Sequence, residues 1–278
     1  MDLLLTNIGL LCTPQGTQPR KGARQGEVLC VEKAMVAIEA GKIVYAGPKD
    51  PALHAEKTVD CGGRLCTPGL VDAHTHLAFG GWRQKELGLK LAGVPYLDIL
   101  QQGGGILNTV DQTRLATEAE LIDKGMGLLS EMLRHGTTTA EAKSGYGLNL
   151  ETERKQLQVI NKLNESHPVD LVPTFMGAHA VPREYRGRRQ EYVDLVIHQM
   201  LPAIAEEKLA RFCDVFCETG VFTPEESLRI LEQAKRLGLG GKLHADEVDS
   251  LGGAELAAKA KCLTAEHLVA ASAQGILD

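Results

Sequence analysis

The chain has 278 residues, of which 44% are hydrophobic and 24% charged, a balance that is typical of a folded globular protein and excludes wholesale disorder. Its formal net charge of −6 argues against a nucleic-acid partner. No run of about 18 apolar residues is present, and the amino-terminal segment lacks the cationic lead of a secretory signal, so we expect no membrane partner. Seven scattered cysteines fit reduced thiols, which predicts a cytoplasmic protein.

The first part of the chain consists of short segments with β-strand character. Residues 3–8 form one such segment, and residues 35–39 and 42–45 predict a hairpin. Residues 15–25 are rich in glycine, proline and polar side chains, which indicates a loop. This β module, residues 1–64, has too little apolar surface to fold alone.

From about residue 65, segments with strand character alternate with segments of helical periodicity. Thr117 and Thr223 each begin a capping box, and Gly136 and Gly238 stand where helices should end. Such alternation predicts parallel strands, either in an open doubly wound sheet or in a closed barrel. The expected strands span residues 69–73, 137–142, 169–175, 213–217, 241–245 and 263–266.

We favour the α/β barrel of the TIM type, because polar residues recur at the C-terminal ends of several of these strands. In such barrels the chemistry gathers at that end. Six units are two fewer than the usual eight, so either the barrel predicted for residues 65–278 is incomplete or the count of units is wrong.

His74 and His76 follow the first of these strands and predict part of a metal site. Side chains two apart on a strand point to the same side, and a neutral imidazole offers a lone pair to a cation. An isolated pair of this kind is more often structural, but His244 ends another strand and can supply a third ligand. A catalytic site of the zinc type uses about three protein ligands and leaves one position open for water.

Glu247 and His267 stand near these histidines at strand ends. Metal-bound water has a pKa of about 7, and Glu247 is placed to move a proton between that water and a leaving nitrogen. Alternatively, the Glu247 carboxylate is itself a ligand. His267 is a candidate to hydrogen-bond the nucleophile or to polarise the substrate carbonyl.

Three more residues suit substrate binding. The planar guanidinium of Arg83 matches a substrate carboxylate, although a surface ion pair is an alternative. Tyr146 lies between two glycines in a loop, where it either meets substrate or packs on the barrel rim. His179 either binds substrate or satisfies backbone groups of its loop.

The chain resembles the amidohydrolase superfamily through residues 68–76 and the strand ends at His244 and His267. Within it, the chain is similar to the imidazolonepropionase family. The similarity lies in the runs His74-Thr-His-Leu-Ala-Phe-Gly-Gly81, Lys143-Ser-Gly-Tyr-Gly-Leu148 and Leu243-His-Ala-Asp-Glu247. It implies hydrolysis of the lactam C–N bond of 4-imidazolone-5-propanoate, giving N-formimidoyl-L-glutamate in histidine degradation.

The resemblance also implies ligands and partners. It implies one zinc or iron ion held by His74, His76, His244 and a later aspartate, with Arg83, Tyr146 and His179 binding a small, carboxylate-bearing substrate. It further implies a homodimer and a small β-sandwich domain to which residues 1–64 contribute. The family's aspartate follows the eighth strand, whereas this chain stops near the sixth. Our hypothesis is therefore that the 278-residue chain alone is unstable or inactive.

Two other functions remain open. A deaminase of the same superfamily, acting on a heterocyclic ring, would use the same histidines and Glu247. Arg83 and Tyr146 favour the carboxylate-bearing substrate over a neutral base. A non-catalytic metal-binding protein is the third reading, and it predicts that Glu247→Gln changes nothing.

Overall fold

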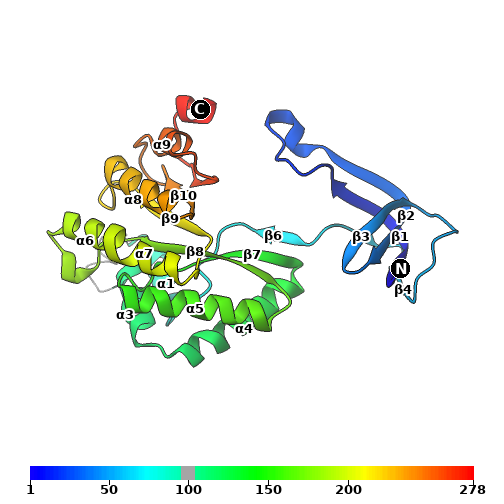
Figure 1. The fold of residues 1–278 in the computed structure, drawn as a ribbon, viewed down its shortest axis with the longest axis horizontal. Coiled ribbons are helices and arrows are strands. Elements are labelled where there is room, and N and C mark those ends of the chain that lie inside the picture. Colours follow the sequence, from blue (N-terminus) through cyan, green and yellow to red (C-terminus); the bar gives the residue numbers. More distant parts are fainter. Residues whose placement is uncertain (95–103) are drawn as a thin grey trace. The chain divides into compact units, whose positions relative to one another are not determined.

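The computed structural model of this protein describes residues 1–94 and 104–278, which form two compact units (Figure 1). We call Met1–Gly69 the sheet unit and Leu70–Asp278 the half-barrel. The sequence predicts a boundary after residue 64. In the structure the short strand β5, Leu65–Cys66, pairs with β1 and so extends the first unit beyond that point.

The sheet unit contains one five-stranded sheet, with the order β3-β2-β1-β4 and with β5 beside β1. The predicted hairpin is present and turns at Ala40 and Gly41, both of which have positive φ angles. Apolar side chains lie on both faces of the sheet. Successive residues of a strand point to opposite faces, and the neighbours Val36 and Ala37 accordingly belong to separate clusters. The elements are β1 (Leu3–Pro14), a 3₁₀ turn η1 (Gly22–Gly26), β2 (Val28–Glu39), β3 (Lys42–Pro48) and β4 (Lys57–Asp60).

The half-barrel is built on a six-stranded sheet with the order β11-β10-β9-β8-β7-β6, in which every neighbouring pair is parallel. This order follows the chain without a reversal, as in a barrel and unlike a doubly wound sheet. All six predicted strands are confirmed. They are β6 (Leu70–Asp72), β7 (Thr137–Lys143), β8 (Asp170–Ala178), β9 (Phe212–Cys217), β10 (Gly240–Ala245) and β11 (Thr264–His267).

Helices cover the strands: α4 packs on β7, α5 on β8, α8 on β9 and α9 on β10 (Figure 1). The helices and turns are α1 (Gln84–Leu91), α3 (Ile106–Leu115), α4 (Glu118–Arg134), α5 (Leu150–Ser166), η2 (Arg183–Tyr185), α6 (Arg189–Leu195), the π-helical turn η3 (Val196–Met200), α7 (Leu201–Glu206), α8 (Pro224–Arg236), α9 (Gly253–Ala260) and α10 (Ala273–Leu277).

Local sequence explains where these helices begin and end. Thr117 and Thr223 form the predicted capping boxes at the starts of α4 and α8. Gly136 follows the end of α4 with a positive φ, which a glycine adopts without strain. A Cβ atom on Gly125 would lie 2.5 Å from Leu163 Cδ1, so this glycine lets α4 pack closely on α5.

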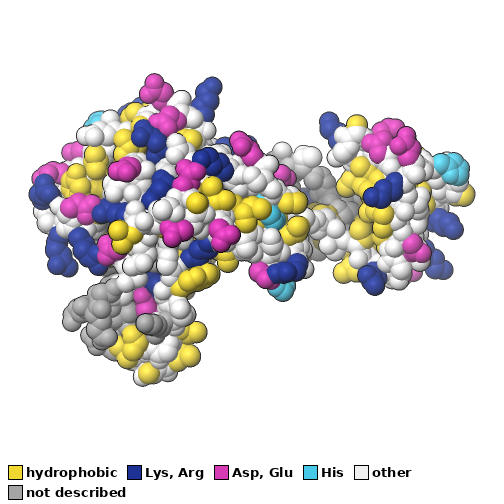
Figure 2. Space-filling view, turned by 90° about the horizontal axis from the view of Figure 1, so that it is seen from below, with side chains coloured by type: hydrophobic (Ala, Val, Ile, Leu, Met, Phe, Trp, Pro, Cys, Tyr) yellow, Lys and Arg dark blue, Asp and Glu magenta, His cyan; other side chains and the backbone are white. Residues whose placement is uncertain are grey.

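Hydrophobic side chains alternate with charged ones over the surface of both units (Figure 2). Within residues 1–94 and 104–278, no helix combines the length and the apolar character that a membrane span requires.

Candidate metal centre

Three histidines from two strands converge at the C-terminal edge of the half-barrel sheet. His74 and His76 follow β6 directly, and His244 lies in β10. One ligand atom from each ring lies within 4.8 Å of those from the other two. The ring centroid of His74 is 5.6 Å from that of His76 and 4.5 Å from that of His244. The predicted convergence of these side chains is present in the structure.

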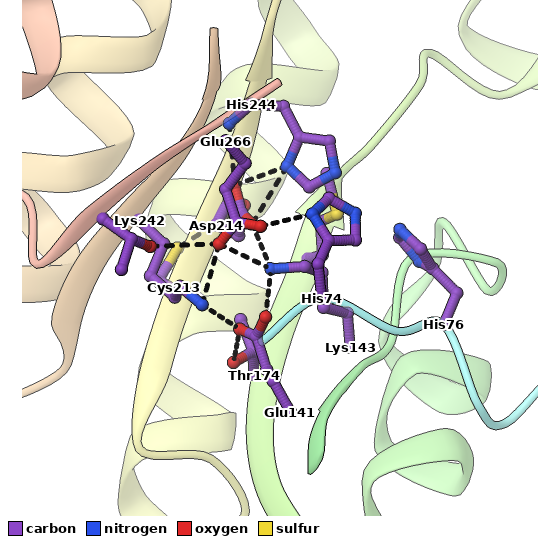
Figure 3. Close-up of polar contacts among 12 residues, drawn as sticks. His74, His76, Glu141, Lys143, Thr174, Cys213, Asp214, Lys242, His244 and Glu266 are labelled. Atoms are coloured by element: carbon purple, nitrogen blue, oxygen red, sulfur yellow. Dashed lines mark hydrogen bonds and ion pairs between the residues drawn. The ribbon is translucent and has the colours of Figure 1, made fainter. Parts of the chain in front are cut away.

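Each of the three rings has its Nδ1 atom held by an oxygen acceptor, and Figure 3 shows these contacts for His74 and His244. His244 Nδ1 lies 3.0 Å from Asp214 Oδ1, and His76 Nδ1 lies 3.3 Å from the Ser144 carbonyl oxygen. His74 Nδ1 contacts the Glu266 carboxylate. Carbonyl and carboxylate oxygens only accept, so each Nδ1 carries the proton and each Nε2 keeps a lone pair for a ligand.

The protonation state of these rings also suits metal binding. Burial, together with the neighbouring rings of His179 and His244, holds the pKa of His76 well below its usual range. A neutral imidazole is the form that binds a cation. Three imidazoles that present Nε2 to a common point fit a zinc or iron ion, and they leave coordination positions for other groups.

Below the histidines lies a buried ionic network centred on two lysines (Figure 3). Lys143 Nζ lies 2.6 Å from Glu141 Oε2, 2.7 Å from Asp214 Oδ2 and 3.4 Å from Glu266 Oε1. Lys242 Nζ lies 2.6 Å from Glu141 Oε1 and 2.8 Å from Glu266 Oε1. The three carboxylates are close enough to hold a cation, but the two ammonium groups already offset two of their three negative charges.

The network keeps its carboxylates ionised despite their burial. Burial alone would raise the pKa of Asp214, but His244 and Lys143 outweigh it and lower the pKa to about 2. The same competition, with His74 and Lys242 as partners, holds the pKa of Glu266 far below its usual range. Asp214 and Glu266 therefore remain acceptors that orient the His244 and His74 rings.

Sequence reasoning did not assign roles to the members of this network. Glu141, Lys143 and Glu266 belong to the polar residues at the ends of predicted strands, and the sequence gives them no further role. Asp214 and Lys242 lie inside predicted strands and receive no role from the sequence. A signal was available, because Asp214 and Lys242 stand inside segments predicted to be buried strands. A charge in such a strand requires a partner from another strand.

Glu247 and His267 lie beside the three histidines. His267 Nε2 is 3.5 Å from Glu247 Oε2, and the His267 ring centroid is 4.9 Å from that of His244. Burial outweighs the attraction of Glu247 and lowers the pKa of His267. The φ angle of His267 is +69°, a conformation that is strained for a side-chain-bearing residue and that occurs preferentially at functional sites.

His179 and Tyr146 surround His76. The His179 ring stacks on His76 with centroids 4.6 Å apart, and its Nδ1 donates to the Gly145 carbonyl oxygen at 3.0 Å. Burial lowers the pKa of His179 to about 3, so this ring is neutral at physiological pH. The Tyr146 ring lies 5.3 Å from His76, between two glycines as the sequence predicts.

Arg83 reaches the same place from the loop before α1. A cavity of about 140 Å³ is lined by Arg83, Tyr146 and His76, with Phe79, Gly81, Trp82 and Thr109 completing its wall. Arg83 also lies 3.8 Å from Glu86, and its side chain is 36% exposed, so the guanidinium is available to a ligand. The structure thus brings all eight predicted site residues to one edge of the half-barrel.

Comparison with known proteins gives consistent results. No family model matches the chain. The chain is 54% identical to the imidazolonepropionase of Bacillus velezensis and 53% identical to that of Alkaliphilus metalliredigens. These matches cover 99% and 98% of this chain and 66% of each relative, so the chain spans just under two thirds of their length.

Among solved structures, an adenosine deaminase from Xanthomonas campestris with bound zinc is similar with a TM-score of 0.53. The identity is 22%, and the match covers 88% of this chain and 49% of that one, which supports the fold alone. From the sequence similarity over nearly all of its length, we conclude that the chain belongs to the imidazolonepropionase family.

Proposed function

We propose that the half-barrel carries the metal-binding and proton-transfer part of an imidazolonepropionase. This activity is the hydrolysis of the lactam C–N bond of 4-imidazolone-5-propanoate to N-formimidoyl-L-glutamate in histidine degradation. The observation that carries the proposal is the convergence of His74, His76 and His244, with their Nδ1 atoms occupied, in a chain whose relatives bear this name.

His74, His76 and His244 would hold one zinc or iron ion through Nε2. When bound, such an ion supplies Lewis acidity, which polarises a carbonyl group and makes a water molecule a better nucleophile near neutral pH. The structurally similar deaminase from Xanthomonas campestris contains zinc, which supports this class of cofactor. Asp214 and Glu266 keep two of the rings in the required tautomer.

Glu247 would act as the general base and then as the general acid. Its half-exposed carboxylate takes the proton of the attacking water and delivers it to the ring nitrogen when the C–N bond breaks. His267 contacts this carboxylate, and its lowered pKa leaves the ring neutral, so it serves as a hydrogen-bonding group. The two roles open to it are orienting the water and polarising the substrate carbonyl.

The cavity beside His76 would hold the rest of the substrate. The Arg83 guanidinium forms a two-pronged contact with the propionate carboxylate, for which its planar fork is suited. Tyr146 in the cavity wall and the neutral His179, whose ring stacks on His76, would supply hydrogen bonds and ring surface to the substrate.

We further propose a cytoplasmic homodimer in which the five-stranded sheet unit contributes to a β-sandwich domain. Apolar clusters on both faces of the sheet support the β-sandwich, because one sheet alone leaves such faces partly in water.

An assay with two simultaneous readouts tests the function. The loss of imidazolone absorbance and the release of ammonia are measured for the metal-loaded chain, alone and joined to the part of the Bacillus velezensis relative that it does not match. We expect the joined chain to hydrolyse the lactam without releasing ammonia. Ammonia release without lactam hydrolysis would instead identify a deaminase.

The role of Glu247 is tested in the same assay. Glu247→Gln should lower kcat by about 10²- to 10⁴-fold, the usual worth of a general acid–base group. Glu232→Gln, an exposed change on α8, serves as the control and should leave kcat unchanged. Equal rates for the two variants would exclude Glu247 as the proton carrier.

A further inference from the structure

Two cysteines of the sheet unit face each other across neighbouring antiparallel strands. Cys12 of β1 and Cys30 of β2 are direct partners in the register, and their Sγ atoms lie 3.2 Å apart. Directly opposed residues of an antiparallel pair have Cα atoms about 4.5–5.5 Å apart, which falls within the span that a disulfide bridges. The backbone is thus already arranged for a covalent link.

The two thiols differ in access to solvent. Cys30 is exposed, whereas Cys12 is half-buried. The hydrogen bond with Cys30 raises the pKa of Cys12, so Cys12 keeps its proton while both thiols are reduced. Cys30 is therefore the thiol that is accessible to a reagent from solution.

The three cysteines of the half-barrel have less suitable surroundings. Cys213 is buried in β9, where burial raises the pKa of its thiol well above the usual range. Burial also raises the pKa of Cys217 and Cys262 to about 11 each. A high pKa leaves little thiolate, which is the reactive form. Cys12 and Cys30 combine direct contact between their sulfurs with an exposed partner.

We propose that Cys12 and Cys30 are a site of reversible disulfide formation by exchange with a small disulfide of the glutathione class. The Cys30 thiolate attacks one sulfur of oxidised glutathione, and the S–S bond breaks to release one reduced glutathione. Cys12 then attacks the Cys30 sulfur and displaces the second reduced glutathione. The two protons lost by the protein thiols pass to the two glutathione thiolates, so the two cysteines are oxidised and one glutathione disulfide is reduced.

The disulfide would close a ring around the exposed segment between β1 and β2, which contains residues 15–27. Such a ring restricts the unfolded chain, so oxidation should raise the melting temperature of the sheet unit by about 5 °C or more. The same ring would hold the two strands together after proteolytic cleavage of the segment at Lys21 or Arg24. This site lies outside the metal centre and does not depend on the proposed activity.

The test uses the full native chain and oxidised glutathione as the probe. After incubation, free thiols are blocked with an alkylating agent, and the unreduced protein is digested with trypsin and analysed by mass spectrometry. The expected product is a peptide pair joined through Cys12 and Cys30 that has lost the mass of two hydrogens and carries no glutathione. Dithiothreitol should restore both thiols and reverse the rise in melting temperature.

Two variants control the result. Cys12→Ser should leave glutathione attached to Cys30, because the second attack is removed, and Cys61→Ser should form the cross-link as the parent does. In dithiothreitol both variants should melt like the reduced parent, which shows that they fold, and after oxidation only Cys61→Ser should show the higher melting temperature. The proposal is overturned if both thiols remain alkylated in the parent, if glutathione stays on Cys30, or if Cys30 joins another cysteine or a second chain.

Discussion

The sheet unit and the half-barrel differ in whether their polar side chains are buried. Within residues 1–69, all of which the structure describes, every buried side chain is apolar, and ion pairs such as Arg24–Glu27 lie in solvent. The half-barrel buries Lys143 and Asp214 completely. Burying charges is costly and leaves little net stabilisation even when they are paired. The difference therefore indicates that the half-barrel network serves the geometry of the site, because Asp214 and Glu266 hold two histidine rings.

The largest expected effect comes from removing the central lysine of the network. Lys143→Met removes the ammonium group nearest to the buried Asp214 and one of the two that contact Glu141, so the free energy of unfolding should fall by about 3–5 kcal/mol. Lys42→Met, an exposed change in the sheet unit, should alter it by less than about 0.5 kcal/mol. Denaturant unfolding of both variants measures the contrast. Similar losses in the two would show that burial does not distinguish the units.

The orienting role of the network predicts an effect on metal affinity. Asp214→Asn should weaken zinc binding by about 10- to 100-fold, because the amide can present a donor to His244 Nδ1 and no longer fixes its tautomer. Competition with a coloured chelator measures the affinity. The exposed Asp170→Asn change at the start of β8 should have no effect. An unchanged affinity in Asp214→Asn would reduce the network to a structural role.

A pH dependence follows from the buried neutral ring of His179. Its pKa is about 3 in the folded chain and near 6.5 when unfolded, so between these values the unfolded state binds a proton that the folded state does not. The contribution of the neutral His179 ring to the free energy of unfolding is therefore fully present above pH 6.5. It decreases by up to about 1.4 kcal/mol per pH unit as the pH falls from 6.5 toward 3. Unfolding of the metal-free chain at several pH values should give a shallower slope for His179→Gln. Parallel slopes would mean that His179 is protonated in the folded state.

The smallest expected effects test whether the units unfold separately. Ile8→Val removes one methyl group from a sheet-unit cluster, and Ile160→Val does so in the half-barrel core. Each should cost about 0.5–1.5 kcal/mol. Calorimetry should assign the first loss to one transition and the second to another. A common shift of a single transition would contradict the division into two units.

Much of this architecture could be predicted from sequence because it depends on local patterns. Strands β8 and β9 are short, largely apolar segments, and the capping boxes at Thr117 and Thr223 are complete within four residues. Strand β4 was not predicted, since Lys57–Asp60 is polar and exposed and becomes a strand only by pairing with β1. Its conformation depends on a partner more than fifty residues away.

The site divides in the same way. His74 and His76 could be placed together because they are two positions apart, which is one repeat of a strand. The contact of His74 with Glu266 joins residues 192 positions apart in the sequence. It depends on how the sheet brings its two outermost strands, β6 and β11, near each other, which no local pattern encodes. The partners of the network could therefore not be assigned, although their charges inside apolar strands required partners.

The number of metal ions bound per chain tests the central claim most directly. The chain is stripped with a chelator and titrated with zinc, with His244→Ala as the test and the exposed His198→Ala as the control. The account predicts one tightly bound ion in the parent and in His198→Ala, and its loss in His244→Ala. Tight binding of one ion that persists in His244→Ala would contradict the three-histidine centre.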